Sequence, residues 1–193
     1  MIILGSKSSR RYELLCEYFH DIKVVAPEID EKNIFNLSPI DYVSWLSKEK
    51  NLAVLKMIDE SEKGNLVVTA DTIVVYKGTI LEKPKDKSEN LLFLEVLNGN
   101  THAVYTAVSI YFNGTVESFI SSTKVSFYKL EKEQLKWYVD TEDGLDKAGG
   151  YGIQGKGKIL VKKISGDYYS VMGFPIAEFY HYVINNNWHA ALS

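Results

Sequence analysis

Hydrophobic residues along the chain occur partly in short continuous runs and partly at helical intervals, which predicts strands and helices in alternation. The run over residues 66–75 is rich in Val and Ile and predicts a strand covered on both faces. Residues 101–112 and 115–128 predict two long strands, and Asn113-Gly114 between them indicates a tight hairpin. Shorter strands are predicted at residues 2–4, 22–25, 80–81 and 159–164.

Helices are predicted where apolar residues recur every three or four positions behind a capping residue. Ser38 followed by Pro39 is a strong helix start, and Asp86 with Glu89 has the spacing of a capping box. Lys50 interrupts an apolar stripe, so its ammonium either reaches solvent or points into a cleft. The predicted helices are one after Ser9 with apolar residues through Phe19, one from Ser38, and those over residues 86–96, 130–138 and 176–183.

Residues 146–158 are rich in glycine, and the segment 150–155 matches the pattern G-x-G-x-x-G. A dinucleotide site is rejected, because no strand precedes the match and another strand, not a phosphate-binding helix, follows it. The glycines predict a tight loop whose backbone approaches a ligand closely. Gln154 within it is either an amide presented to that ligand or a surface residue of an ordinary turn.

Composition narrows the functional classes. A chain of 193 residues that is 46% hydrophobic fits one domain, residues 1–193, or one domain split into two lobes by a cleft. Its net charge of −3 argues against nucleic-acid binding. The single cysteine, Cys16, is expected to be a small core residue in a reducing compartment. Because neither a signal peptide nor a membrane-spanning run is visible, we expect a cytoplasmic protein without a membrane partner.

Asp71 is the most unusual residue of the buried strand. A buried carboxylate needs a cation or hydrogen-bond donors, so Asp71 is either part of a site or a structural residue at a bulge. Arg10 and Arg11 fall in the first turn of a predicted helix, where two cations indicate a bound anion or, alternatively, a solvated surface pair. Three acidic residues in one loop face either a metal or water, namely Glu28, Asp30 and Glu31.

Together these features predict a site for a small polyanion such as a nucleoside phosphate. A carboxylate there could orient or deprotonate water, and a divalent cation is expected because carboxylate and phosphate otherwise repel each other. The cations near loop ends are Arg10, Arg11, Lys50, Lys83 and Lys147.

Six sequence blocks follow one another along nearly the whole chain. They are LGSKSSRRYELL (4–15), TADTIVV (69–75), EKPKD (82–86), LNGNTHAVYT (97–106), DKAGGYGIQG (146–155) and ISGDYYSVMGFP (164–175). These blocks resemble the successive signatures of the Maf family, which hydrolyses nucleoside triphosphates to the monophosphate and pyrophosphate. The resemblance implies an α/β fold with a mixed, partly antiparallel sheet flanked by helices, in two lobes around a central cleft, similar to the inosine triphosphatase-like fold. It also implies a homodimer.

The same resemblance assigns roles to individual residues. It implies that Asp71 is the general base, that Lys83 is a second catalytic residue and that a divalent cation, Mg²⁺ or Mn²⁺, takes part. The combination of Arg10, Thr72 and Gln154 resembles the dTTP/UTP-cleaving subgroup and not the 7-methyl-GTP subgroup. A glutamine amide can complement the O4 and N3–H edge of uracil or thymine. The residues implied to bind substrate are Ser6, Arg10, Arg11, Glu31, Lys50, Thr72, Lys83 and Gln154.

The chain departs from the family pattern at a few positions. Gly5 replaces the usual Ala and Ser9 the usual Pro, and both changes are expected to loosen the phosphate loop. Trp45 and Ser47 stand where Arg and Ala are expected. The sequence thus predicts a pyrophosphatase acting on dTTP, UTP and modified pyrimidine nucleotides. The alternative is a regulatory nucleotide-binding protein that acts through partners in septum formation during cell division.

Overall fold

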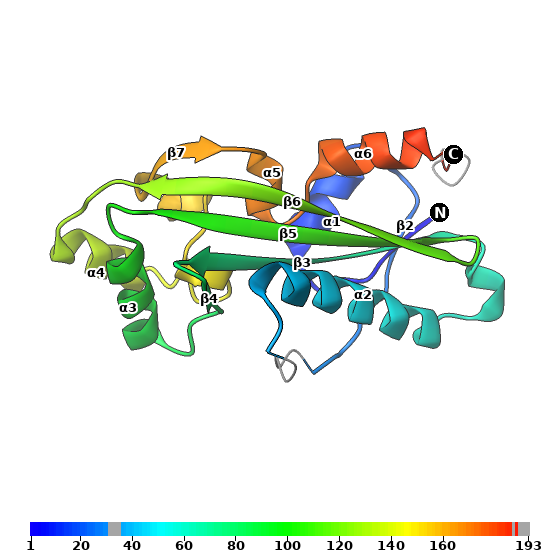
Figure 1. Cartoon of the computed structure of the whole chain (residues 1–193), viewed down its shortest axis with the longest axis horizontal. Helices are drawn as coiled ribbons and strands as arrows, with labels where there is room; N and C mark the ends of the chain where they lie inside the picture. The colour runs from blue at the N-terminus through cyan, green and yellow to red at the C-terminus, as the bar shows by residue number, and fades with distance from the viewer. Residues whose placement is uncertain (31–35, 187, 189–193) are drawn as a thin grey trace. The chain divides into compact units, whose positions relative to one another are not determined.

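The computed structural model describes residues 1–30, 36–186 and 188 (Figure 1). Seven strands form one sheet in the order β2-β1-β3-β5-β6-β7, with β4 paired to β3. β1 is parallel to β2 and β3, whereas the pairs β3–β4 and β6–β7 are antiparallel. The predicted α/β class with a mixed sheet is confirmed. The strands are β1 (Ile2–Leu4), β2 (Ile22–Val24), β3 (Leu66–Tyr76), β4 (Thr79–Leu81), β5 (Thr101–Phe112), β6 (Thr115–Phe127) and β7 (Val161–Ser165).

Helices connect these strands, and the chain divides into two compact units. Unit 1 contains Met1–Asp71, Thr106–Ser121 and Gly173–Ser193, and unit 2 contains Thr72–Tyr105 and Ser122–Met172. The α-helices are α1 (Ser9–Cys16), α2 (Pro39–Met57), α3 (Lys87–Leu97), α4 (Lys132–Asp140), α5 (Tyr168–Met172) and α6 (Ile176–Asn185), and the 3-10 helices are η1 (Glu60–Glu62), η2 (Ala148–Gly150) and η3 (Gly155–Ile159).

In unit 1, helices cover both sides of the strands (Figure 1). α2 packs on the sheet through a cluster of buried residues, Ile3, Val54, Ile58 and Val67. On the other side lie α1 and α6, where Phe19 meets Phe179 edge-to-face with ring centroids 5.8 Å apart. β1 and the part of β3 in unit 1 are therefore buried on both faces, as the apolar run in β3 predicts.

Local sequence signals set the beginnings of the helices. Ser38 accepts a hydrogen bond from the backbone of Asp41, with Pro39 at the first helical position of α2. Asp86 likewise accepts from the backbone of Glu89 at the start of α3. These two predicted helix starts are confirmed. Among the helices that the described residues form, none has the length and apolar character needed to cross a membrane.

The two hairpin turns have backbone conformations that follow from their sequences. Asn113 and Gly114 have φ of 49° and 85°, and Lys77 and Gly78 have φ of 48° and 82°. Two successive positive φ angles match the twist of antiparallel strands, so each pair of residues closes a tight hairpin. The predicted turn at Asn113-Gly114 is confirmed.

Several predicted boundaries are wrong. α1 ends at Cys16 instead of continuing to Phe19, and Cys16 is half-buried and not a core residue. α4 begins at Lys132, not at residue 130, because both backbone groups of Leu130 bond to the side chain of Asn98. Gly155–Ile159 forms a 3-10 helix, so β7 begins only at Val161. The short α5 was not predicted at all.

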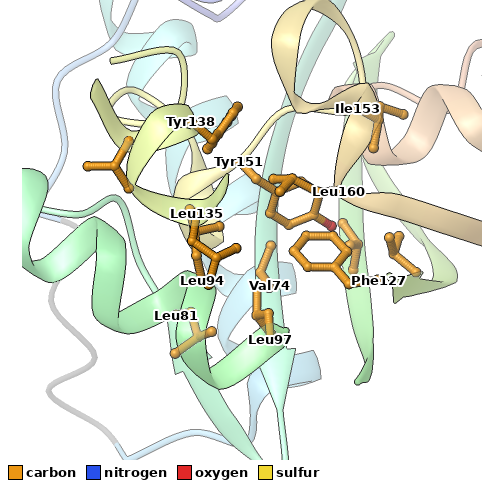
Figure 2. Close-up of a cluster of buried hydrophobic side chains, with 13 residues drawn as sticks. Val74, Leu81, Leu94, Leu97, Phe127, Leu135, Tyr138, Tyr151, Ile153 and Leu160 are labelled. Carbon is orange, nitrogen blue, oxygen red and sulfur yellow. The ribbon is translucent and has the colours of Figure 1, made fainter. Parts of the chain in front are cut away.

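Unit 2 has its own core, in which aromatic rings meet edge-on (Figure 2). Phe127 and Tyr151 have centroids 4.7 Å apart at 85°. His102 is 3% exposed, and its Nε2 lies 2.6 Å from the hydroxyl of Tyr151. Burial lowers the pKa of His102 to about 4, because the imidazolium cannot be hydrated there. Among the described residues Nδ1 has no partner, so a proton added there would stay unbonded.

His102 should therefore make stability depend on pH. The unfolded chain protonates this histidine near pH 6.5, whereas the folded chain does so only near pH 4. The contribution of neutral His102 to the free energy of unfolding is thus fully present above pH 6.5. It is lost as the pH falls towards 4, and the loss is about 3 kcal/mol in total. Urea unfolding of the wild type and His102→Gln between pH 7.5 and 4.5 measures this. The two free energies of unfolding should converge by that amount at low pH, and parallel profiles would contradict the assignment.

Candidate active site

Asp71 in β3 is paired with Lys50 of α2. The two side chains are 13% and 14% exposed, so the ion pair is largely removed from water. A carboxylate inside a buried strand is costly unless a cation meets it, and Lys50 supplies that cation. The prediction that Asp71 requires a partner is confirmed. Of the two alternatives for Lys50, its ammonium points inward to Asp71 and not to solvent.

Hydrogen bonds on either side of Lys50 hold α2 against the sheet. Thr69 donates its hydroxyl to the carbonyl of Ser47 at 2.6 Å. Asn51 donates its amide to the carbonyls of Val67 at 3.2 Å and Ser109 at 3.1 Å. Positions three and four apart lie on one face of a helix, so Ser47, Lys50 and Asn51 all face the strands. The register of α2 on β3 is thereby fixed, and with it the position of Lys50 opposite Asp71.

In the loop before α1, two hydrogen-bond donors point to the buried Ser6. The hydroxyl of Ser6 accepts hydrogen bonds from the backbone N–H of Ser8 at 3.1 Å and from Arg11 Nη1 at 3.2 Å. Arg11 also donates through Nε to the carbonyl of Gly173 at 2.8 Å. Arg11 is therefore held in place from two directions, and Arg10 is half-buried in the same first turn. An anchored guanidinium at a helix N-terminus is suited to an anion.

Gly5 at the start of this loop is tightly packed, which contradicts the expectation that it loosens the loop. A Cβ at Gly5 would lie 2.4 Å from Cγ2 of Thr69 and 2.6 Å from Cγ2 of Val54. Thr69 cannot rotate away without breaking its hydrogen bond to Ser47. The backbone of Gly5 is also bonded to the carbonyl of Val68 at 2.8 Å. Glycine is thus required here by the close approach of β3 and α2.

Ser9 and Trp45 are also accommodated locally. Ser9 is the first helical residue of α1, while the preceding Ser8 provides the cap. The helix therefore begins at Ser9 although no proline stands at its first position. Trp45 on α2 stacks on Tyr42 with ring centroids 6.2 Å apart.

The other predicted site residues belong to unit 2. Thr72 follows Asp71 in β3 and is half-buried, whereas Lys83 and Gln154 are exposed. Gln154 immediately precedes η3 but makes no capping hydrogen bond to it through its side chain. The backbone N–H of Gly149 donates to the carbonyl of Glu82 at 3.0 Å. The glycine-rich loop that carries Gln154 is therefore bonded to the segment that carries Lys83.

Some predicted charges have other partners. Lys147 pairs with Asp146 at 2.6 Å and contacts the backbone of Asp143, so its charge stabilises the loop itself. Glu28 pairs with Lys7 at 2.9 Å, and this lysine lowers the pKa of Glu28. Glu31 lies outside the described residues.

Sequence reasoning missed two buried asparagines, Asn51 and Asn90. Asn90 on α3 donates its amide to the carbonyl of Gly150 at 2.8 Å. The signal was present in the helical spacing, because Asn90 lies four positions before Leu94 and seven before Leu97, both buried. A polar residue on the apolar face of a helix indicates a buried hydrogen bond.

The sequence profile of one protein family, described as Maf-like protein, matches residues 1–185. The chain belongs to the Maf family. The resemblance of the six sequence blocks is thus confirmed. The chain is similar to proteins named dTTP/UTP pyrophosphatase from three organisms. The one from Carboxydothermus hydrogenoformans is 40% identical over 181 residues, covering 93% of this Maf chain and 95% of the relative. The one from Pyrococcus abyssi is 45% identical over 176 residues, which cover 91% of each chain. The one from Bacillus cytotoxicus is 45% identical over 175 residues, which cover 91% of this chain and 90% of the relative.

The packing of this Maf chain around Gly5 can be tested directly. Gly5→Ala should lower the free energy of unfolding by about 1–3 kcal/mol, because the new methyl overlaps two stiff β-branched side chains. Adding Thr69→Ser removes Cγ2 but keeps the hydroxyl for Ser47, so the double variant should regain part of the loss. Chemical denaturation of both variants and of Thr69→Ser alone provides the measurement. Strictly additive effects would contradict the predicted overlap.

Proposed function

We propose that this Maf protein is a nucleoside triphosphate pyrophosphatase that hydrolyses dTTP, UTP and modified pyrimidine nucleotides to the monophosphate and pyrophosphate. The observation that carries the proposal is the carboxylate of Asp71, held by Lys50 within a buried strand. The names of the related proteins, at 40 to 45% identity, support the same reaction.

Asp71 acts in this proposal as the general base. It takes a proton from a water molecule, whose oxygen forms a bond to the α-phosphorus. The bond between the α-phosphorus and the oxygen that bridges to the β-phosphate breaks, and pyrophosphate leaves with the bonding electrons. Because Lys50 and the hydrogen bonds between α2 and the neighbouring strands hold Asp71 in place, little reorganisation is needed before the proton moves.

The triphosphate carries several negative charges and needs fixed donors. In unit 1, Ser6, Arg10 and Arg11 are assigned to the phosphates, because the loop before α1 already directs donors to one place. Lys50 stabilises charge on the phosphates as well as on Asp71. In unit 2, Lys83 is assigned a catalytic role as a further cation, since it is exposed beside the rigid Pro84. Glu31 remains an assignment from the family resemblance.

Gln154 and Thr72 are assigned to selection of the base, together with Arg10. The amide of Gln154 offers one donor and one acceptor, which complement the O4 and N3–H groups of uracil or thymine. Gln154 lies on a glycine-rich loop, so the nucleobase can approach the backbone of that loop closely.

A divalent cation, Mg²⁺ or Mn²⁺, is part of the proposal. Among the described residues, no group of three or more His, Cys, Asp or Glu side chains could hold a metal ion. Asp71 is the candidate carboxylate ligand for the cation, since Mg²⁺ usually takes one or two carboxylates together with substrate phosphates and water. When bound, it would neutralise charge that develops on the phosphates. A homodimer in the cytoplasm stays a prediction.

Pyrophosphate release from UTP, dTTP, CTP, GTP and 7-methyl-GTP in the presence of Mg²⁺ tests the reaction. UTP and dTTP should be preferred, and Asp71→Asn should lower turnover by about two to four orders of magnitude, because the carboxamide cannot accept the proton. Glu62→Gln is the matched control, since it also removes a carboxylate from a lysine pair in unit 1, that with Lys23 at 2.5 Å. Binding of UTP without any turnover would favour the regulatory role in cell division instead.

Removal of the divalent cation is a separate test. Excess EDTA should lower pyrophosphate release to the uncatalysed rate, and added Mg²⁺ or Mn²⁺ should restore it. The melting temperature of the free protein should stay unchanged in EDTA, because the cation takes most of its ligands from substrate and water. Full activity in EDTA would remove the cation from the mechanism.

A further inference from the structure

Asn90 on α3 lies against the glycine-rich loop of unit 2 that carries Gln154. Its side chain is fully buried at 0% exposure and donates to the carbonyl of Gly150 at 2.8 Å. The two residues are 60 positions apart in the sequence. A side-chain amide that reaches a loop carbonyl over this separation fixes the loop to α3, and the catalytic chemistry described above does not use it.

Glycines near Asn90 pack so closely that a side chain would not fit at their positions. Gly150 has a φ of 72°, and a Cβ there would lie 2.1 Å from Asn90 Nδ2. A Cβ at Gly144 would lie 2.0 Å from the carbonyl oxygen of Gly150 and 3.1 Å from Asn90 Oδ1. The backbone thus comes so close to Asn90 that no larger residue fits at either position.

The same loop also contacts the segment that carries Lys83. Gly149 donates its N–H to the carbonyl of Glu82 at 3.0 Å, and the Cβ position of Gly150 is 3.6 Å from Cγ of Pro84. Lys83 lies between these two anchored residues. A displacement of Gly150 would therefore move both the base-reading loop and a phosphate-binding cation.

Between Gly150 and Gln154, each residue is held by a contact with the core of unit 2. Tyr151 enters the aromatic core, where Figure 2 shows it beside Phe127, and Gly152 donates its N–H to the hydroxyl of Tyr138 at 3.2 Å. Ile153 is buried in the same core. Gln154 follows as the first exposed residue.

We propose that Asn90 is a positioning residue that sets the place of Gln154 and Lys83 and thereby determines base selectivity; this inference rests on the proposed function. Cytosine presents the donor and acceptor of uracil in exchanged places, so an amide that turns over reads cytosine equally well. Discrimination therefore depends on a loop that holds Gln154 in one place relative to the nucleobase. Asn90 provides that constraint through Gly150.

The test compares kcat/KM for UTP and CTP in the wild type and in Asn90→Ala. The UTP-to-CTP ratio should fall by about tenfold or more, because small displacements of a positioning contact have large kinetic effects. Asn90→Asp should lower the ratio as Asn90→Ala does. It keeps the size of the side chain but loses the N–H group that donates to the carbonyl of Gly150. Asn90→Ser, whose hydroxyl is too short to replace the amide, carries the test if the first variant does not fold.

Asn98→Ala is the matched control. Asn98 lies just after the other end of α3 and makes two side-chain bonds, each 2.8 Å, to the backbone of Leu130, which is outside the glycine-rich loop. It should lose stability but keep the wild-type UTP-to-CTP ratio. Equal ratios in folded Asn90 variants and the wild type would overturn the inference while leaving the proposed function intact. A wild type that releases no pyrophosphate would instead overturn the proposed function, and the inference with it.

Discussion

The ion pair of Asp71 and Lys50 places the strongest constraint on the structure. A carboxylate in the middle of a strand that is covered on both faces is stable only if its cation is always present. The chain achieves this through hydrogen bonds from the side chains of Thr69 and Asn51 to backbone carbonyls, which hold α2 on β3 and β5 independently of the pair. The charge that the proposed reaction needs is thus maintained by packing that has no role in the chemistry.

Both units use glycine for the same purpose. Gly5 lets the loop before α1 approach Thr69, and Gly150 lets a second loop approach Asn90. In each case a polar side chain that is committed to a buried hydrogen bond occupies the space that a Cβ would need. At these positions glycine allows two segments to pack in close contact, although its general effect is to add flexibility.

The features that the sequence predicted well depend on short-range chemistry. The turn at Asn113-Gly114 and the start of α2 at Ser38 are set by residues that are neighbours in the chain. The need of Asp71 for a cation or hydrogen-bond donors also followed from one strand alone, although two alternatives for Lys50 remained until the structure placed it.

What escaped prediction depends on distant contacts. The carbonyl that Asn90 bonds is 60 residues away, and no local pattern identifies it. The start of α4 was misplaced because Leu130 is held by Asn98, which precedes β5. Gly5 was taken as a loosened position because the sequence contains no sign that Thr69 and Val54 converge on it.

The packing at Gly5 also has a consequence for sequence divergence. Three positions share one small volume there, since Cγ2 of Thr69 and Cγ2 of Val54 both border the place of a Cβ. A larger residue at position 5 becomes acceptable only after both of its neighbours have shifted or become smaller. Lineages that descend from this chain should therefore exchange these residues in order, with positions 69 and 54 changing before position 5.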